Sequence, residues 1–210
     1  RGGVAEPELH VTEAIASVLT NCNRRSASRP CRALDLGANN GWMSAHMMQL
    51  GAHVTAVEPS PDLSRALNET AEVNCWADRL TLHTARACLR ADARCFHPKP
   101  CATCSCGGWR WGNTLGHAQV TVRHGEACAM RFGLPAAVGG VVYEDLLWEA
   151  SAGTGELDLI KMDADGPEGA WMRSLDELLS RPADGRPRLR VRSLIVEGSR
   201  LEPAVMVRLQ

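Results

Sequence analysis

The chain has 210 residues, of which 45% are hydrophobic, and its formal net charge at pH 7 is −1. This length and composition suffice for one domain with a substantial buried core. The near-neutral charge excludes long-range attraction to nucleic acid or to an anionic membrane, and no apolar run is long enough to span a membrane.

The first predicted element is an amphipathic helix near the amino terminus. Its apolar positions follow helical spacing and are Val11, Ile15, Val18 and Leu19. A polar loop from Asn21 to Pro30 follows, so residues 1–30 are predicted to be a helix and a linker. Residue 1 is Arg and no signal-peptide pattern follows it, so we expect a processed or partial chain.

Residues 32–43 predict a strand, a tight glycine turn and a helix. Gly37 and Gly41 lack a Cβ, so they can adopt positive φ and let the backbone approach a ligand. The spacing Gly-x-x-x-Gly after Asp35 is neither a P-loop nor the Gly-x-Gly-x-x-Gly pattern. A carboxylate there would repel a diphosphate but suits an ammonium group or a ribose hydroxyl. The pattern therefore favours a nucleoside with a cationic amino-acid group, and S-adenosylmethionine fits best.

A second buried strand, His53 to Pro59, carries Glu58 at its end. Glu58 lies 23 positions beyond Asp35, close to the offset of about 20 at which an acid binds ribose hydroxyls. The alternative is a strand-end acid that merely faces solvent. Ser60 and Pro61 start a helix whose predicted apolar stripe is Leu63, Ala66, Leu67 and Ala71. Leu80 to Cys88 is the third predicted strand, and an adenine would lie near its end, at Thr84 to Ala87.

Residues 90–117 form a predicted insertion rich in cysteine, tryptophan and glycine. Zinc binding, disulfides and free thiols all remain open for its cluster of Cys95, His97, Cys101, Cys104 and Cys106. Disulfides would indicate a secretory or Golgi lumen. The insertion would lie over the carboxyl edge of the sheet, where it can shape the acceptor site or meet a protein partner. Trp109 and Trp111 either stack on a sugar or anchor the loop to the core.

The rest of the chain predicts further strands and helices. Short strands are expected at Gln119 to Arg123 and Gly140 to Tyr143, with a helical turn at Glu144 to Ala150. A strand from Leu157 leads into Asp163, with Asp165 and Glu168 just beyond it. Pro167 starts a helix with the core face Trp171, Leu175, Leu178 and Leu179. A strand from Arg190 to Glu197 and a helix from Pro203 onward complete the prediction.

These elements predict a single α/β domain over residues 1–210, with a Rossmann-like, doubly wound, mostly parallel sheet flanked by helices. Ligands of such sheets bind beyond the carboxyl ends of the strands. The acids after residue 162 should therefore face the same crevice as Gly37 and Glu58.

Two stretches together resemble the FkbM-like family of S-adenosylmethionine-dependent methyltransferases. They are Asp35-Leu-Gly-Ala-Asn-Asn-Gly41 with Val57-Glu-Pro59, and Asp158-Leu-Ile-Lys-Met-Asp-Ala-Asp-Gly-Pro-Glu168 with Ile195-Val-Glu197. The resemblance implies O-methylation of a sugar or other hydroxyl acceptor. The implied cofactor-binding residues are Asp35, Gly37, Ala38, Asn39, Gly41 and Glu58. The family usually has Glu-Gly where this chain has Asp165-Gly166, and its final strands are expected to be missing after Gln210.

The implied reaction is in-line attack of the acceptor oxygen on the sulfonium methyl. Asp163 is the first candidate base and Asp165 the second, while Glu168 is better explained as a helix-capping acid. No metal site is expected. Two alternatives remain: Asp163-Ala-Asp165 as the Asp-x-Asp motif of a metal-dependent glycosyltransferase, or an inactive methyltransferase-like scaffold subunit of a larger assembly.

Overall fold

The computed structural model describes residues 6–25, 28–92, 139–164, 167–180, 185–196 and 205–208. The strands are β1 (Arg32–Leu36), β2 (His53–Val57), β3 (Leu80–His83), β4 (Arg86–Cys88), β5 (Gly140–Val142), β6 (Glu156–Leu157), β7 (Leu159–Met162), β8 (Arg190–Val191), β9 (Ser193–Val196) and β10 (Val205–Arg208). The helices are α1 (Glu6–Arg25), α2 (Trp42–Gln49), α3 (Pro61–Val73), α5 (Tyr143–Ala150) and α6 (Glu168–Ser180), with the 3₁₀ helix η1 (Ala77–Arg79).

The described strands form a central sheet in the order β10-β9-β7-β1-β2-β3. All neighbours pair in parallel except β10, which is antiparallel to β9. From β1 the chain passes to β2 and β3 on one side, and later to β7 and β9 on the other. The strand order therefore reverses between β1 and β7, where ligands of open α/β sheets bind. The predicted Rossmann-like, mostly parallel sheet is confirmed.

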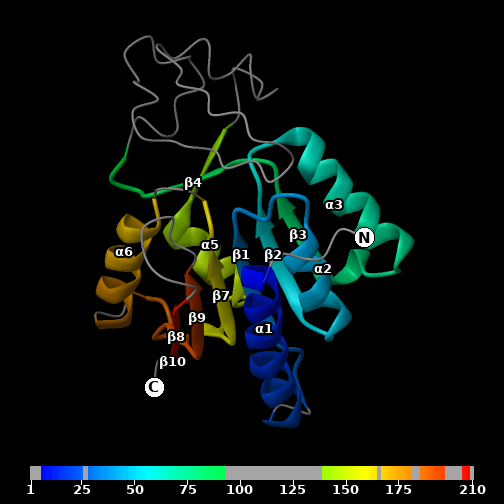
Figure 1. Ribbon diagram of the computed structural model, residues 1–210. Helices are drawn as coiled ribbons and strands as arrows, with labels where there is room; N and C mark the ends of the chain where they lie inside the picture. The colour runs from blue at the N-terminus through cyan, green and yellow to red at the C-terminus, as the bar shows by residue number, and fades with distance from the viewer. Residues whose placement is uncertain are drawn as a thin grey trace.

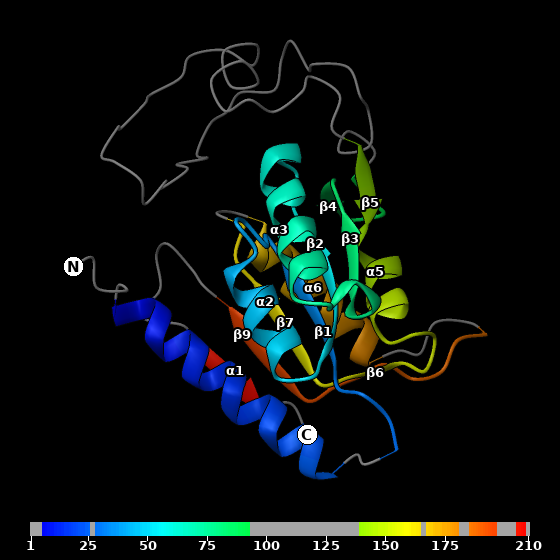
Figure 2. The same cartoon turned by 90° about the vertical axis from the view of Figure 1, so that its right-hand side faces the viewer.

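Helices cover both faces of this sheet (Figure 1, Figure 2). Ile15 of α1, Met47 of α2 and Leu67 of α3 belong to one buried cluster, and Leu147 of α5 and Trp171 of α6 belong to the other. Strand β1 supplies both clusters, because successive side chains of a strand point to opposite faces. Its Ala33 lies in the first cluster and its Leu34 and Leu36 in the second.

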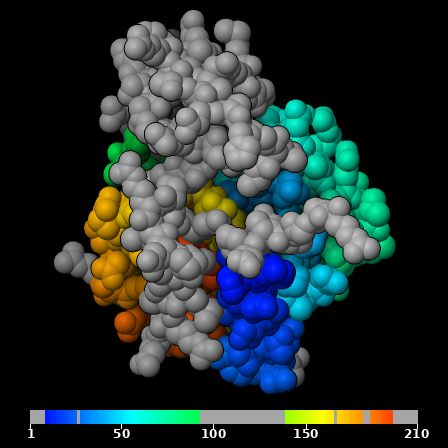
Figure 3. All heavy atoms as spheres, in the orientation of Figure 1, coloured from blue at the N-terminus to red at the C-terminus, as the bar shows by residue number. Residues whose placement is uncertain are grey.

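Helix α1 is longer than the sequence predicted. The predicted stripe of Val11, Ile15, Val18 and Leu19 is buried, as expected. Cys22 adds a further buried position one turn after Val18, so the helix continues to Arg25 where a loop was predicted. The helix contacts α2 and β7 and lies at the surface of the molecule, where it is drawn in blue (Figure 3).

Helix α3 begins at Pro61, as predicted, but its buried face differs. Ala66 is exposed and Leu63 is only half-buried, whereas Ser64, Leu67 and Ala71 are buried. A serine is tolerated there because its Oγ donates to the Glu58 carbonyl oxygen at 3.0 Å.

Three predicted strands are each divided in two. The segment 80–88 forms β3, which pairs with β2, and β4, which pairs with β5. The segment 156–162 breaks at Asp158 into β6 and β7, and the segment 190–196 breaks at Arg192 into β8 and β9. In each pair, the two halves bond to different neighbours. Local hydrophobicity does not encode such a change of partner.

The helix predicted from Pro203 onward is wrong, because residues 205–208 form β10. Val205 lies opposite Val196 and Val207 opposite Leu194 in the antiparallel pair. Antiparallel pairing with β9, the preceding strand, outweighed the local signal of a proline that can start a helix. The strand predicted at Gln119 to Arg123, most of the cysteine-rich insertion, Asp165 and Glu197 lie outside the described residues.

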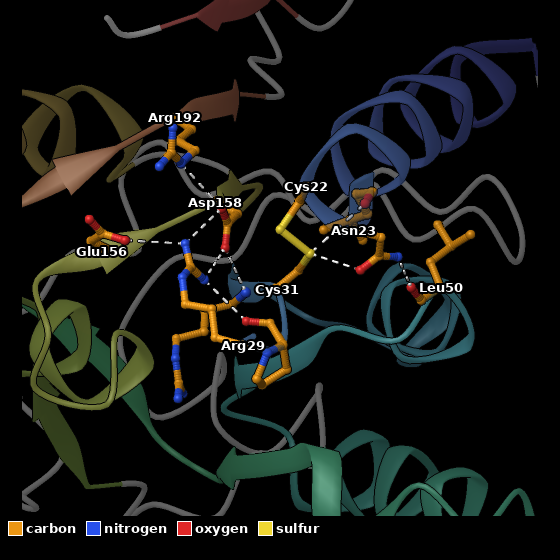
Figure 4. The surroundings of a disulfide bond; sticks show 11 residues. Cys22, Asn23, Arg29, Cys31, Leu50, Glu156, Asp158 and Arg192 are labelled. Carbon is orange, nitrogen blue, oxygen red and sulfur yellow. Dashed lines mark hydrogen bonds and ion pairs between the residues drawn. A yellow bond between two sulfur atoms is a disulfide. The ribbon is translucent and has the colours of Figure 1, made fainter. Parts of the chain in front are cut away.

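A disulfide and an ion-pair cluster hold the amino-terminal edge of the sheet (Figure 4). Cys22 of α1 and Cys31, just before β1, are bonded, and both are buried. Arg29, between them in sequence, makes hydrogen bonds of 2.8 and 3.2 Å to the two carboxylate oxygens of Asp158. The Asp158 carboxylate also accepts from the Arg32 backbone N–H at 3.0 Å, so this loop is tied to the start of β7.

No helix among the described residues is long and apolar enough to span a membrane. Cys88 is also disulfide-bonded, and Cys75 is an exposed free thiol.

The double variant Cys22→Ala/Cys31→Ala should unfold more easily than the parent chain. A bond across a sequence separation of 9 restricts the unfolded chain by about 3 kcal/mol on the chain-entropy model. Urea unfolding measures this loss. Cys75→Ala removes a thiol that is exposed and unbonded, and should leave stability unchanged. Equal stability of the double variant and the parent would contradict the prediction.

Candidate ligand crevice at the carboxyl edge of the sheet

The candidate site lies where β1, β2 and β7 end. The turn at residues 37–41 connects β1 to α2. The Gly37 and Ala38 backbone N–H groups donate to the Val57 carbonyl oxygen at 3.0 and 3.1 Å, which holds the turn against the end of β2. The Asp163 N–H donates to the Leu36 carbonyl oxygen at 3.0 Å, which joins the end of β7 to the same turn. The predicted convergence of these three segments is therefore observed.

Asp35 is fully buried and is paired inside the protein. Its Oδ1 accepts from Lys161 Nζ at 3.1 Å, and its Oδ2 accepts from Ser44 Oγ at 2.7 Å. The Asp35 side chain is 0% exposed and that of Lys161 is 4% exposed, so a ligand in the crevice does not reach this carboxylate in the present conformation. A buried carboxylate needs such partners because desolvation penalises an uncompensated charge.

Lys161 connects the strands that flank the switch point. Besides Asp35, it donates to the Gly37 carbonyl oxygen at 3.2 Å and lies 3.5 Å from Asp163 Oδ2. The sequence reasoning gave this lysine no role. A signal was present, however, because a lone lysine inside a buried apolar strand usually has a buried partner of opposite charge.

The two glycines of the turn are required by packing within the protein. Gly37 has φ +78°, and a Cβ placed on it would lie 1.8 Å from the Asp163 carbonyl oxygen. Gly41 has φ +82°, and its Cβ would lie 2.6 Å from Leu67 Cδ1. The close approach inferred from the sequence is thus to β7 and α3, whether or not a ligand is present.

Glu58 joins the turn to the end of β2. Its Oε2 accepts from the Asn39 N–H at 2.9 Å and its Oε1 from the Ser60 N–H at 2.7 Å. Asn39 has φ +52°, which asparagine tolerates better than most residues. Burial raises the pKa of Glu58 above its ordinary value, and the two backbone donors oppose this effect. Each oxygen accepts one backbone bond and retains a second lone-pair position.

The remaining predicted site residues have distinct surroundings. The Ala38 side chain is buried in the core, so only its backbone can meet a ligand. Asp163 is 34% exposed, which makes it more accessible than Asp35 or Glu58. Glu168 Oε1 accepts from the Ala164 N–H at 2.7 Å, which agrees with a structural role at the start of α6. Asp165 lies outside the described residues.

The end of β3 offers a further side-chain contact that the sequence did not predict. His83 Nε2 lies 2.8 Å from Glu149 Oε2 of α5, and the His83 carbonyl oxygen accepts from the Glu58 N–H at 3.0 Å. The adenine position expected at Thr84 to Ala87 follows directly and stays a prediction. Nothing in the sequence pairs residues 83 and 149, because their contact depends on the fold.

The fold defines the class of protein, a Rossmann-like α/β protein whose strand order reverses between β1 and β7. No protein-family model matches the sequence, and no curated protein matches it. The resemblance to the FkbM-like family is therefore not confirmed.

Three of the solved structures that the chain resembles are titled as a methylase or a methyltransferase. The ribosomal protein L11 methylase of Lactobacillus delbrueckii subsp. bulgaricus is 25% identical, over 36% of this chain and 38% of that chain, with a TM-score of 0.28. Magnesium protoporphyrin IX methyltransferase (ChlM) of Synechocystis PCC 6803, with bound SAM, is 19% identical over 41% and 44%, with a TM-score of 0.32. The METTL16 methyltransferase domain is 12% identical over 92% and 52%, with a TM-score of 0.46. The match thus spans about half or less of each of these solved chains.

Gly37→Ala should destabilise the protein more than Gly51→Ala. Both glycines have positive φ, at +78° and +86°, but a Cβ at Gly51 meets nothing within 4 Å. Gly51→Ala should therefore cost only the backbone strain of about 1–2 kcal/mol. Gly37→Ala should add about 1–3 kcal/mol, because the Asp163 backbone must move. Urea unfolding compares the two variants, and equal losses would show that the approach to Asp163 is unimportant.

Proposed function

We propose that the protein is an S-adenosylmethionine-dependent methyltransferase. The proposal rests above all on Glu58, which is fixed at the end of β2 and bonded to the glycine turn through the Asn39 N–H at 2.9 Å. With one backbone donor on each oxygen, Glu58 can still accept from both hydroxyls of a ribose. The place, the residue type and the remaining hydrogen-bonding capacity all suit a nucleoside.

The charge of the crevice favours a cationic cofactor over a dinucleotide. Lys161 pairs with the buried Asp35 at 3.1 Å and lies 3.5 Å from Asp163, and its charge also acts on Glu58. With Asp35 and Glu58 buried, the Asp163 carboxylate, which is 34% exposed, is the acid most open to a ligand among the described residues of the site. Such a carboxylate attracts a sulfonium and an ammonium group but repels a diphosphate.

Asp163 is the residue we assign to proton transfer. When bound, S-adenosylmethionine supplies an electrophilic methyl group on its sulfonium. The acceptor oxygen forms the new bond to carbon as the bond to sulfur breaks, and the acceptor proton passes to a carboxylate within hydrogen-bond reach. Asp163 is the most exposed of the three acids and directly follows β7. Asp165 is the second candidate for this role.

The acceptor we propose is a hydroxyl group, of a sugar or another alcohol. The disulfides at Cys22–Cys31 and at Cys88 are typical of proteins that fold in an oxidising compartment. They support a secretory or Golgi lumen, where glycan hydroxyls are abundant acceptors. Membership of the FkbM-like family belongs to the same proposal and rests on the residues of the two matching stretches.

Two other functions are alternatives, and a specific experiment would reveal each of them. A metal-dependent glycosyltransferase would need carboxylates that hold a divalent ion. Among the described residues, the group of side chains that suits a metal is Cys22, Cys31 and Asp158, whose two cysteines form a disulfide, while Asp165 lies outside the described residues. Added manganese and a nucleotide sugar would test that alternative. An inactive scaffold would show no binding of S-adenosylmethionine or S-adenosylhomocysteine by calorimetry at millimolar ligand, although the protein is folded.

Glu58→Gln should weaken the binding of S-adenosylhomocysteine by roughly tenfold or more, because hydrogen bonds to a charged group contribute about 1.5–3 kcal/mol. Calorimetry measures this loss, and Asp62→Asn, which changes an exposed acid of α3, is the matched control.

The same carboxylate should make binding pH-dependent. Because burial raises the pKa of Glu58, the native state holds this proton more tightly than the unfolded chain. Its stabilising effect is present at low pH and is lost as the pH rises through the raised value. The ribose needs the ionised form, so affinity should fall as the pH drops from neutral toward a midpoint above 4.5. In Glu58→Gln this dependence should disappear, and an unchanged profile would contradict the assignment.

Asp163→Asn should slow methyl transfer by about 10²–10⁴-fold, the usual contribution of a general base. Binding of S-adenosylhomocysteine should weaken less than in Glu58→Gln, since Asp163 contributes negative charge to the site but is not assigned to the ribose. Transfer is measured with labelled donor and an acceptor found by screening glycans and small alcohols. If Asp163→Asn and Glu58→Gln lose binding equally, the division of roles is wrong.

A further inference from the structure

We propose that a second site, the groove between α2 and α3, binds a neutral saccharide ring. This groove is a cavity of about 310 Å³ beside the glycine turn, and Asn40 and Gly41 of that turn also line it. Its volume is at the small end of the roughly 300–1,000 Å³ of ligand pockets, so it suits one ring rather than a long chain. The inference does not depend on the proposed methyltransferase activity.

Residues of α2 and α3 form two walls of this groove. Trp42, His46 and Gln49 lie at i, i+4 and i+7 on α2, so they share one face of that helix. Thr70 of α3 and Asn74 at its carboxyl end face them across the groove. The opposite side of α2 carries the buried Ser44, Met47 and Met48. Helix α2 therefore turns its apolar side to the core and an aromatic and amide stripe to the cavity.

The aromatic residues offer a stacking surface. Trp42 is 54% exposed at the first position of α2. Trp76 lines the same cavity and packs partly against the core. A large ring left half-exposed gains free energy when an apolar face covers it. The C–H face of a pyranose provides such a cover while its hydroxyls stay at the rim.

The polar groups of the groove match the hydroxyls of a sugar. Asn40 Oδ1 accepts from the Trp42 N–H at 3.2 Å, which leaves the Asn40 amide N–H groups as donors. Asn74 Nδ2 donates to the Thr70 carbonyl oxygen at 2.8 Å, which leaves the Asn74 amide oxygen as an acceptor. Each sugar hydroxyl both donates and accepts, so neighbouring hydroxyls can pair with both amides.

His46 supplies an unmet hydrogen-bonding group. Its Nε2 is buried and has no hydrogen-bond partner in the part of the chain that the structure describes. A buried polar atom in this state costs about 1–3 kcal/mol until a partner reaches it. Because His46 itself lines the cavity, a ligand hydroxyl becomes the partner of Nε2 when the half-buried imidazole turns toward the cavity.

The lining excludes a charged ligand. Among the described residues that form the cavity there is no Asp, Glu, Lys or Arg. A phosphate, a carboxylate or an amine would lose its hydration there without gaining a counter-charge. A neutral ring with polar edges, such as a hexose or an N-acetylhexosamine, can stack on the tryptophans, bond to the amide groups and carries no charge.

Saturation-transfer NMR tests this site with the methyl glycosides of glucose, galactose, mannose and N-acetylglucosamine, at about 10 mM, above the roughly 1 mM affinity of a weak ligand. We expect transfer from at least one glycoside to the full chain without any cofactor. Trp42→Ala and His46→Ala should each weaken binding at least tenfold, and Trp42→Phe should retain part of it. Met172→Ala removes a 41% exposed apolar side chain of α6 and should change nothing.

Each outcome decides the proposal. The proposal is overturned if no glycoside shows transfer to the folded parent chain, or if transfer to Trp42→Ala equals that to the parent. It is also overturned if indole, added as an apolar probe, binds and no glycoside does. Circular dichroism shows whether each variant is folded, and Trp42→Phe provides the comparison if Trp42→Ala is not. The glycoside experiment contains no S-adenosylhomocysteine, so its failure is distinct from failure of the proposed methyltransferase function.

Discussion

The crevice depends on the buried ion pair between Lys161 of β7 and Asp35 of β1. Both side chains are almost inaccessible, and the same ammonium group also holds the Gly37 carbonyl oxygen at 3.2 Å. Loss of one partner of a buried pair costs roughly 3–5 kcal/mol, because the other charge remains uncompensated. Through Lys161, the pair therefore joins the glycine turn to the end of β7, next to Asp163.

This pairing changes which residues account for the ligand preference. Read from the sequence, Asp35 is the acid that repels a diphosphate, but in the structure Lys161 neutralises it and burial hides it. The preference for a cation then rests on Asp163, which is 34% exposed, while Glu58, at 2% exposed, is almost as buried as Asp35. Similarly, the glycines meet Asp163 and Leu67 rather than free space. Their presence therefore follows from packing, and evidence for activity has to come from the two acids.

Local pattern predicted much of the fold, whereas contacts between distant segments were missed. Hydrophobic runs and the glycine turn give β1, α2, β2 and α3, because these depend on residues close in sequence. The breaks at Asp158 and Arg192 depend on which distant strand becomes the neighbour, whereas the strand at residues 205–208 depends on antiparallel pairing with β9, the strand before it. For the site, the position of Glu58 at a strand end is a local feature and was predicted. The bond from Lys161 to Asp35 joins residues 126 apart, which no periodicity reveals.

The pairing of β1 with β7 is held at both of its ends by different chemistry. At the amino end, Arg29 and the Arg32 N–H bind Asp158, and the Cys22–Cys31 bond restrains the loop that carries Arg29. At the carboxyl end, Lys161 binds Asp35 beneath the crevice. Because hydrogen bonds of the parallel ladder lie between these two clusters, a slip of register would break both at once. The disulfide end contributes stability without touching a ligand, whereas the lysine end couples the same register to the geometry of the candidate site.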